Sequence, residues 1–351
     1  MSKAAELAAL IGSQTALSNR NLIINGAMQV DQRNTTVTTS AYSCDRWFVH
    51  KTNFDELVFA ADQDTTSPDG FSNSLKVAVT TAETALASDE LFYIRYQIEG
   101  QDLQHLNYGT SSAKSIILSF YVRSSLTGKY SILFYEPTDT RSNTQSFTIN
   151  SANTWEYKTI TIDGDTIGSL TNDNTGQFQF YITLAAGTDY AGTPHSGWGA
   201  YTATDDYAFS DQVDFSAQTG TFYLTGVQLE LGEQATPFEH RSFGDELARC
   251  QRYYYQTQNS ENSVHTQRSY NNSNSYIGSL AYPVTMRATP SFSAQTNTIT
   301  LPGISNTTGT FSTHSITRHN ALIEIAPASD AGAYTYTVIA KSNAMKFDAE
   351  L

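Results

Sequence analysis

Apolar and polar residues alternate with a period of two through most of this chain. The alternation is strongest in residues 92–98, 116–122 and 178–184, where every second position is a large aliphatic or aromatic residue. Such a pattern is typical of a strand with one buried and one solvated face. Turn-forming segments such as residues 67–70 and 163–165 separate these stretches. Residues 21–240 are therefore predicted to form an all-β fold of two antiparallel sheets, a jelly-roll β-sandwich.

The stretch from residue 221 to 256 closes this region and opens a second one. Val227, Leu229 and Leu231 have strand periodicity, and Gly226 breaks the register, which predicts a β-bulge. A short helix with acidic residues in its first turn is predicted next, followed by a strand that begins in the tyrosine run 253–255. The predicted organisation is an N-terminal helix in residues 1–20, the sandwich in 21–240, a linker helix and strand start in 241–256, and a smaller β domain in 257–351.

The N-terminal helix has a narrow apolar stripe. Leu7, Leu10 and Ile11 have the i, i+3, i+4 spacing of one helix face. A helix this short is marginal alone and needs a partner that covers the stripe. We expect it to serve attachment or oligomerisation; the alternative is a helix folded back on its own domain or a frayed terminus.

The C-terminal part has weaker strand patterns and few large aliphatic residues. As a monomer it would have a thin core, and aromatics such as Tyr334 and Tyr336 would be exposed unless copies of the chain packed together. A homotrimer is the predicted assembly.

Composition limits the classes of partner. The 20 basic and 34 acidic residues give a formal net charge of −14, which opposes binding to nucleic-acid phosphates and to anionic lipid. Neutral sugars are compatible with that charge. No apolar run reaches the length of a membrane span, and no secretory signal is present, so we expect synthesis in the cytoplasm and no membrane insertion.

Catalytic and metal-binding motifs are missing from the sequence. It contains no GxSxG, HExxH or Walker motif, and its acidic residues form no recognisable catalytic pair, so no enzyme, no catalytic residue and no cofactor are predicted. The acidic turns at 163–165 and 205–206 could hold a structural calcium, with solvated Asp/Gly turns as the favoured interpretation. Cys44 and Cys250 are expected to be free thiols; a disulfide between them is the alternative.

One long loop, residues 185–220, is rich in aromatic residues, which argues against disorder and for a function. Trp198 lies between two glycines and is the best candidate for a ring that stacks on a sugar. The alternative is that Trp198 pins the loop onto the sandwich, whereas Trp47 and Trp155 are predicted core residues. The candidate glycan-binding residues are Trp198, Tyr201, Tyr190, Tyr207, Asp205 and Asp206.

Motifs in order along the chain resemble those of a family of bacteriophage tail-fibre and related virion proteins. They are NRNLIINGAM at 19–28, DRW at 45–47, YQIEG at 96–100, LSFYV at 118–122, TWE at 154–156, GVQLELG at 226–232, ATPFEHRS at 235–242, DEL at 245–247, CQRYYYQ at 250–256, PVTMRATP at 283–290 and DAEL at 348–351. The arrangement also resembles carbohydrate-binding-module sandwiches. The resemblance implies a trimeric virion protein that is assembled in the host cytoplasm.

Three functions follow as hypotheses. The first is a tail or head fibre that attaches to other virion proteins through its N-terminal segment and binds host-surface polysaccharide with three copies at once. The second is an architectural capsid-decoration or tail-adaptor protein without receptor binding. The third is a glycan depolymerase.

Overall fold

The computed structural model describes residues 20–257, 263–268, 276–294, 297–301, 304–327, 336–340 and 345–351. The chain divides into two compact units, Met1–Phe243 and Gly244–Leu351. The predicted N-terminal helix with Leu7, Leu10 and Ile11 lies outside the described residues, as do the side chains of Tyr334 and Tyr336.

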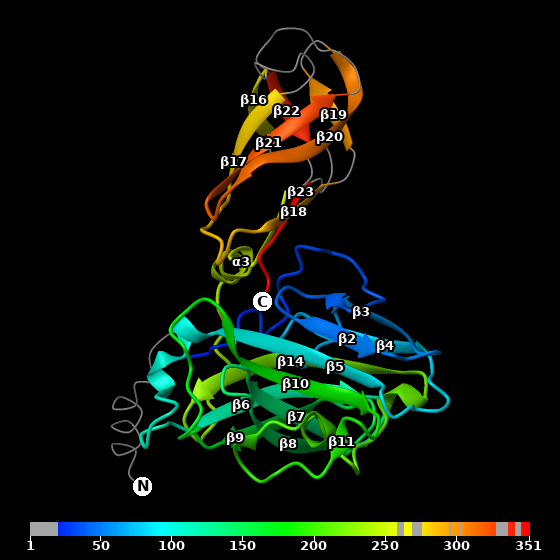
Figure 1. The fold of residues 1–351 in the computed structure, drawn as a ribbon. Helices are drawn as coiled ribbons and strands as arrows, with labels where there is room; N and C mark the ends of the chain where they lie inside the picture. The colour runs from blue at the N-terminus through cyan, green and yellow to red at the C-terminus, as the bar shows by residue number, and fades with distance from the viewer. Residues whose placement is uncertain are drawn as a thin grey trace. The chain divides into compact units, whose positions relative to one another are not determined.

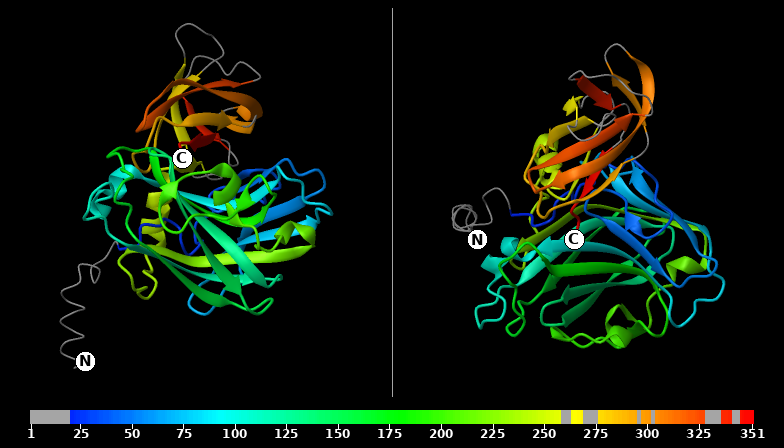
Figure 2. Two further views of the ribbon diagram at one scale, coloured as in Figure 1. Left: turned by 60° about the horizontal axis from the view of Figure 1, so that its bottom comes forward. Right: turned by 45° about the horizontal axis from the view of Figure 1, so that its top comes forward.

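The first unit is a β-sandwich, which confirms the predicted all-β class (Figure 1). A seven-stranded sheet has the order β1-β2-β5-β10-β7-β8-β12 and a five-stranded sheet the order β3-β4-β14-β6-β9. The two sheets can be followed as two layers in Figure 2. The strands of the larger sheet are β1 (Ala41–Tyr42), β2 (Phe48–Thr52), β5 (Leu91–Glu99), β10 (Gly176–Ala186), β7 (Gly128–Glu136), β8 (Arg141–Ile149) and β12 (Gly199–Ala200); those of the smaller are β3 (Val58–Asp64), β4 (Ser74–Thr81), β14 (Gly220–Leu231), β6 (Ile116–Ser124) and β9 (Glu156–Ile162).

The period-two pattern places one set of side chains between the sheets. The alternating residues of 92–98, 116–122 and 178–184 are all buried in one core, together with Trp47, which is fully buried as predicted. Burying each large apolar side chain stabilises the fold by about 1.5–3 kcal/mol. Trp155 differs from the prediction: it is half-buried, outside this core, with its ring centre 6.1 Å from that of Tyr223. The alternation explains this, because Ile160 and Ile162 on the adjoining strand take the inward positions.

Two glycines allow the closing strand β14 to pass close to other segments. The register of β14 against β6 shifts between Thr225 and Gln228, and Gly226 has a φ of 62°, which confirms the predicted bulge. A Cβ on Gly26 would lie 2.1 Å from the backbone oxygen of Val227. Only glycine at position 26 allows this approach, in which the Val227 amide donates to the Gly26 oxygen at 2.9 Å.

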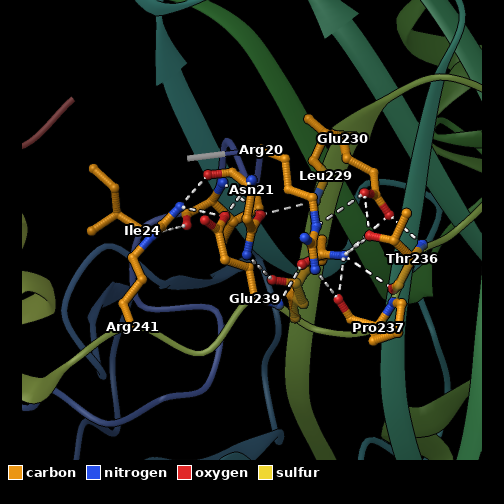
Figure 3. A network of polar contacts seen from close by, with 12 residues as sticks. Arg20, Asn21, Ile24, Leu229, Glu230, Thr236, Pro237, Glu239 and Arg241 are labelled. Atoms are coloured by element: carbon orange, nitrogen blue, oxygen red, sulfur yellow. Dashed lines mark hydrogen bonds and ion pairs between the residues drawn. The ribbon is translucent and has the colours of Figure 1, made fainter. Parts of the chain in front are cut away.

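Near this close approach, a polar network joins the beginning of the described sandwich to the segment after β14 (Figure 3). The Asn21 side chain accepts from the Leu229 amide at 3.1 Å and donates to the Val227 oxygen at 3.2 Å. Its backbone amide donates to Glu239 at 2.8 Å, and the Arg241 guanidinium donates to the backbone oxygens of Ile23 and Asn21. The motif at 19–28 and the motifs at 226–242 are therefore joined in space.

Glu230 anchors the other side of this network. It is fully buried, accepts from the backbone amide and the hydroxyl of Thr236 at 2.7 Å each, and lies 3.6 Å from the Arg20 guanidinium. A buried carboxylate needs such partners, because an unpaired one is costly to bury. The polar residues of these motifs thus have a structural explanation.

Short elements complete the first unit. A parallel pair, β11 (Ala191–Gly192) and β13 (Ala208–Phe209), lies in the long loop after β10. The short helices are η2 (Gly100–Asp102), η3 (Gln104–Leu106), α2 (Ala203–Asp206) and η4 (Phe215–Ala217).

The second unit is smaller and is also β-rich. It starts with helix α3 (Phe243–Gln251), where a linker helix is predicted, and a core of apolar residues around Phe347 and Met286 lies in its described part. One sheet has the order β15-β23-β18, and six strands close on themselves in the order β16-β17-β21-β20-β19-β22. The strands are β15 (Tyr254–Gln256), β16 (Ser263–Arg268), β17 (Tyr276–Ala281), β18 (Ser291–Ala294), β19 (Asn297–Leu301), β20 (Ile304–Ile316), β21 (Asn320–Pro327), β22 (Tyr336–Ala340) and β23 (Met345–Asp348).

Candidate functional site

The outer face of the seven-stranded sheet carries polar and aromatic side chains in register. On β5 the residues between the core positions, Tyr93, Arg95 and Gln97, occupy the outward face. Arg95 pairs with Phe48 on one neighbouring strand and with Tyr181 on the other. The face comprises Phe48 and His50 of β2, Tyr93, Arg95 and Gln97 of β5, Gln179, Tyr181 and Thr183 of β10, and Leu133 and Tyr135 of β7.

The long loop between β10 and β14 packs on part of this face. Thr183 donates to the backbone oxygen of Tyr207 at 2.8 Å, and the Phe209 amide donates to the Ser131 hydroxyl at 3.0 Å. Within the loop, β12 pairs with the start of β8. These bonds use polar groups of the sheet face to fix the loop's position.

Three tyrosines of the loop meet three of the sheet. Tyr207 is central: its ring centre lies 6.0 Å from that of Tyr93, 5.5 Å from Tyr181, 5.7 Å from Tyr190 and 6.1 Å from Tyr201. The rings of Tyr135 and Tyr201 are 4.8 Å apart. Tyr93 and Tyr181 are buried, and the other four are half-buried. We call Tyr93, Tyr135, Tyr181, Tyr190, Tyr201 and Tyr207 the tyrosine cluster.

Five phenols of the cluster, those of Tyr93, Tyr135, Tyr181, Tyr201 and Tyr207, stay neutral at physiological pH. Burial raises the pKa of Tyr93, Tyr181, Tyr201 and Tyr207 above its ordinary value, and it raises that of Tyr135 in the same direction. These five rings are therefore uncharged, and their hydroxyls remain donors and acceptors.

Arg95 is the cation of this face. Its guanidinium carbon lies 4.8 Å from the centre of the Phe48 ring, a cation–π distance. With its amide oxygen turned toward Arg95, Gln97 accepts from the guanidinium at 2.8 Å. Aromatic rings, amides and a guanidinium thus lie together on one side of the sheet.

Trp198 packs against the end of the core. Its indole N–H donates to the backbone oxygen of Asp163 at 2.7 Å, and its ring meets those of Tyr108 and Phe178 edge to face at 6.0 and 6.2 Å. These contacts favour the interpretation that Trp198 pins the loop onto the sandwich. Tyr190, Tyr201 and Tyr207, by contrast, come together in the tyrosine cluster, so the structure separates Trp198 from the other three predicted aromatics.

The two predicted aspartates differ in exposure. Asp205 is half-buried and lies against Gly192. Asp206 is fully buried, where it accepts from the Ser142 hydroxyl at 3.0 Å and lies 3.5 Å from the ring of His195. Ser142, also fully buried, donates to the carboxylate itself, so this Ser-His-Asp group fastens the loop to β8 and presents no exposed nucleophile.

A buried acidic pair lies near Trp198. Glu136 is fully buried, and neither of its carboxylate oxygens has a hydrogen-bond partner in the described part of the chain. Arg141 binds both oxygens of the neighbouring Asp165. Burial first, and the Asp165 charge second, raise the pKa of Glu136 to about 9, so it is a neutral acid at pH 7. The Tyr108 hydroxyl is also without a partner there, and burial raises its pKa.

No group of three or more His, Cys, Asp or Glu side chains that could hold a metal occurs among the described residues. In the acidic turn at 163–165, Asp165 is bound to Arg141. Cys44 and Cys250 are both buried and not joined, and burial raises the pKa of the Cys44 thiol. Within the described ranges, no helix has the length and apolar character needed to cross a membrane.

The glycan-binding residues predicted from the sequence all lie in the long loop and do not include the side chains that the seven-stranded sheet contributes to the candidate site. Tyr93, Arg95, Tyr135 and Tyr181 belong to strands whose core positions are obvious from the alternation. The signal was present, because each lies between two inward-facing residues and so faces outward. The period-two pattern does not predict which outward-facing residues of the sheet the long loop covers.

No family model matches this sequence, and no curated protein matches it. Solved structures give distant matches to carbohydrate-binding-module-like β-sandwiches and to one phage tailspike domain, without assigning a family. The enzymatically active domain of tailspike protein 4 from bacteriophage CBA120 matches with a TM-score of 0.33 and 11% identity over 60% of this chain and 21% of that one.

Two matches cover the other protein almost completely. A putative sugar binding protein from Bacteroides thetaiotaomicron has a TM-score of 0.34 and 14% identity over 60% of this chain and 100% of its own. A family 11 carbohydrate-binding module from Clostridium thermocellum has a TM-score of 0.28 and 13% identity over 58% of this chain and 96% of its own. These likenesses concern the fold of the sandwich.

Proposed function

We propose that this chain is a bacteriophage virion fibre protein that binds host-surface glycan through the outer face of its seven-stranded sheet. The observation that carries the proposal is the gathering of half-buried tyrosines, Arg95 and the Gln97 and Gln179 amides on that face. Aromatic rings lie under the C–H faces of sugars, while amides and charged groups bind the hydroxyls.

The fibre role is supported by the sequence motifs. The motifs at 19–28 and 226–242, at opposite ends of the sandwich sequence, form one hydrogen-bonded network around Asn21 and Glu230. In this proposal the N-terminal segment attaches to other virion proteins, the chain is a homotrimer, and three glycan sites act together on a repetitive polysaccharide. The protein would be assembled into virions in the host cytoplasm.

The test combines binding with mass. Full-length protein is titrated with a panel of bacterial surface polysaccharides, neutral and acidic, by calorimetry and affinity electrophoresis, and its solution mass is measured by light scattering. We expect saturable binding to at least one polysaccharide and a mass three times that of the 38.6 kDa chain.

Other outcomes point to the other hypotheses. A protein that binds no polysaccharide but is retained by purified capsids or tails would be an architectural decoration or adaptor protein. Release of new reducing ends from a bound polysaccharide would make it a depolymerase. A monomeric mass would overturn the trimeric assembly without touching the glycan site.

A further inference from the structure

Arg95 has no ionic partner on the face where it lies. Among the residues that the structure describes, no carboxylate forms an ion pair with its half-buried guanidinium. The nearest acid along its own strand, Glu99, is four residues away. Three other half-buried cations of the sandwich have acidic partners: Arg33 pairs with Asp45 at 3.0 Å, Lys76 with Asp64 at 3.2 Å, and Arg141 with Asp165. Arg123 and Lys51 resemble Arg95, since their described side-chain hydrogen bonds go to backbone oxygens.

The titratable groups around Arg95 do not compensate its charge. Burial raises the pKa values of Tyr93, Tyr181 and Tyr207 by more than the positive charge of Arg95 lowers them. All three phenols therefore stay protonated. Burial and the Arg95 charge together lower the pKa of His50, so His50 is neutral at pH 7. The face therefore presents one uncompensated positive charge in a chain whose formal net charge is −14.

We infer that the glycan bound by this face is acidic, and that Arg95 binds the carboxylate of a uronic-acid residue. This inference rests on the proposed glycan-binding function and narrows its ligand. A guanidinium presents a planar fork of donors that matches a carboxylate, and its pairs with carboxylates are stronger than neutral hydrogen bonds. The half-buried rings of Tyr135 and Tyr201 lie across β10 from the Arg95 strand and supply a surface for a neighbouring sugar ring of the polymer.

The position of Arg95 suits this role. All three of its guanidinium nitrogens lie 2.8–2.9 Å from the Gln97 amide oxygen, which is neutral, and the guanidinium lies over the Phe48 ring. Each of the two Nη atoms carries a second N–H that a carboxylate can accept from. The half-buried setting lowers the local dielectric constant, so an ion pair is worth more here than on an open surface. Losing such a charged hydrogen bond is expected to weaken binding by about 10- to 100-fold.

The five-stranded sheet offers a matched control. Arg123 on β6 also stacks on a ring, 5.2 Å from the centre of Tyr223, and its Nε donates to the backbone oxygen of Asn153 at 2.8 Å. Arg123→Gln therefore removes the same charge and the same kind of stacking from the other side of the sandwich.

The experiment measures affinity for paired polymers. Polygalacturonate, alginate and hyaluronate, and the carboxyl-reduced form of each, are titrated into the full-length wild type, Arg95→Gln, Arg95→Lys and Arg123→Gln, with thermal unfolding of every variant. We expect the wild type to bind at least one acidic polymer at least about 10-fold more tightly than its reduced form. Arg95→Gln should erase this preference, Arg95→Lys should keep part of it, and Arg123→Gln should leave it unchanged.

The inference and the proposed function fail in different ways. Equal affinity for acidic and reduced polymers, or an acid preference that survives Arg95→Gln, overturns the inference and leaves glycan binding standing. Binding of the wild type to only the neutral members of the bacterial polysaccharide panel would also overturn the inference and leave glycan binding standing. A wild type that binds no polysaccharide at all overturns both. If Arg95→Gln unfolds, Arg95→Lys decides: a folded lysine variant that fully retains the acid preference contradicts the fork-like contact, and a reduced or lost preference supports it.

Discussion

The two outer faces of the sandwich carry similar side chains in different surroundings. Each places an arginine against an aromatic ring, Arg95 at Phe48 and Arg123 at Tyr223. Each also has a pair of tyrosines whose ring centres lie at nearly the same separation. The distance is 4.8 Å between Tyr135 and Tyr201, and 4.9 Å between Tyr121 of β6 and Tyr157 of β9. The side chains alone therefore do not distinguish the two faces.

What distinguishes them is the loop. On the seven-stranded face the loop brings Tyr190, Tyr201 and Tyr207 against the sheet, while on the five-stranded face Tyr157 lies on a strand and is 45% exposed. The charges are similar, because Arg123 binds the backbone oxygen of Asn153 and, like Arg95, forms no ion pair within the described residues. A loop that packs several rings against the sheet beside a cation makes a better candidate site than aromatics on a sheet face without such a loop.

The largest expected effect comes from removing the loop's anchor. Trp198→Ala should lower the free energy of unfolding of the first unit by about 3 kcal/mol, near the lower end for a large aromatic residue because the side chain is only half-buried. It should also weaken glycan binding, because the loop carries three of the cluster tyrosines. Urea unfolding and polysaccharide titration measure the two effects.

Trp155→Ala is the matched control on the other face. Trp155 is likewise half-buried but lies outside the core and anchors no long loop, so we expect a loss below about 1 kcal/mol and unchanged affinity. Equal losses of stability and affinity for the two tryptophan variants would contradict the special role of the loop.

Replacing the buried acid Glu136 is expected to raise the free energy of unfolding, by less than Trp198→Ala lowers it. The pKa of Glu136 is raised to about 9 in the folded state, above the ordinary value of 4.5. The folded state therefore keeps a proton that the unfolded chain releases, and stability falls as the pH rises from about 4.5 toward 9. Glu136→Gln removes this loss and should stabilise the protein on the order of 2 kcal/mol at pH 7.

The pH series makes this prediction specific. The stability difference between Glu136→Gln and wild type should vanish near pH 4, where both states hold the proton, and should grow up to about pH 9. Thermal and urea unfolding across this range measures it. If Glu136→Gln were less stable than wild type at pH 7, the account of Glu136 as a buried acid that destabilises the fold at this pH would be contradicted.

Much of the sandwich could be predicted from sequence, because strand periodicity reports which face of each strand is buried. The core positions of β5, β6 and β10 follow directly from residues 92–98, 116–122 and 178–184. The bulge at Gly226 was predictable, since a glycine between two runs of opposite parity indicates an extra residue in the strand. The close approach of Gly26 to Val227 was not, because it joins segments that are far apart in the sequence.

The loop residues of the candidate site could be predicted from the sequence, whereas its strand residues could not. Tyr190, Tyr201 and Tyr207 stand out in a loop, whereas Tyr93, Arg95 and Tyr181 are hidden among core residues of strands. Trp198 looks exposed in sequence, flanked as it is by glycines, yet its indole packs on Tyr108 and Phe178. Local composition describes a loop's content, but its contacts depend on the sheet that it folds onto.

The most direct test of the account compares the affinities of two double variants for the polysaccharide that the wild type binds. Tyr135→Ala with Tyr201→Ala removes the ring pair of the seven-stranded face, and Tyr121→Ala with Tyr157→Ala removes the equivalent pair of the five-stranded face. We expect the first to lose at least about 10-fold in affinity and the second less than about 2-fold. A larger loss from the second pair, or equal losses from both, would contradict the claim that the seven-stranded face is the glycan-binding one.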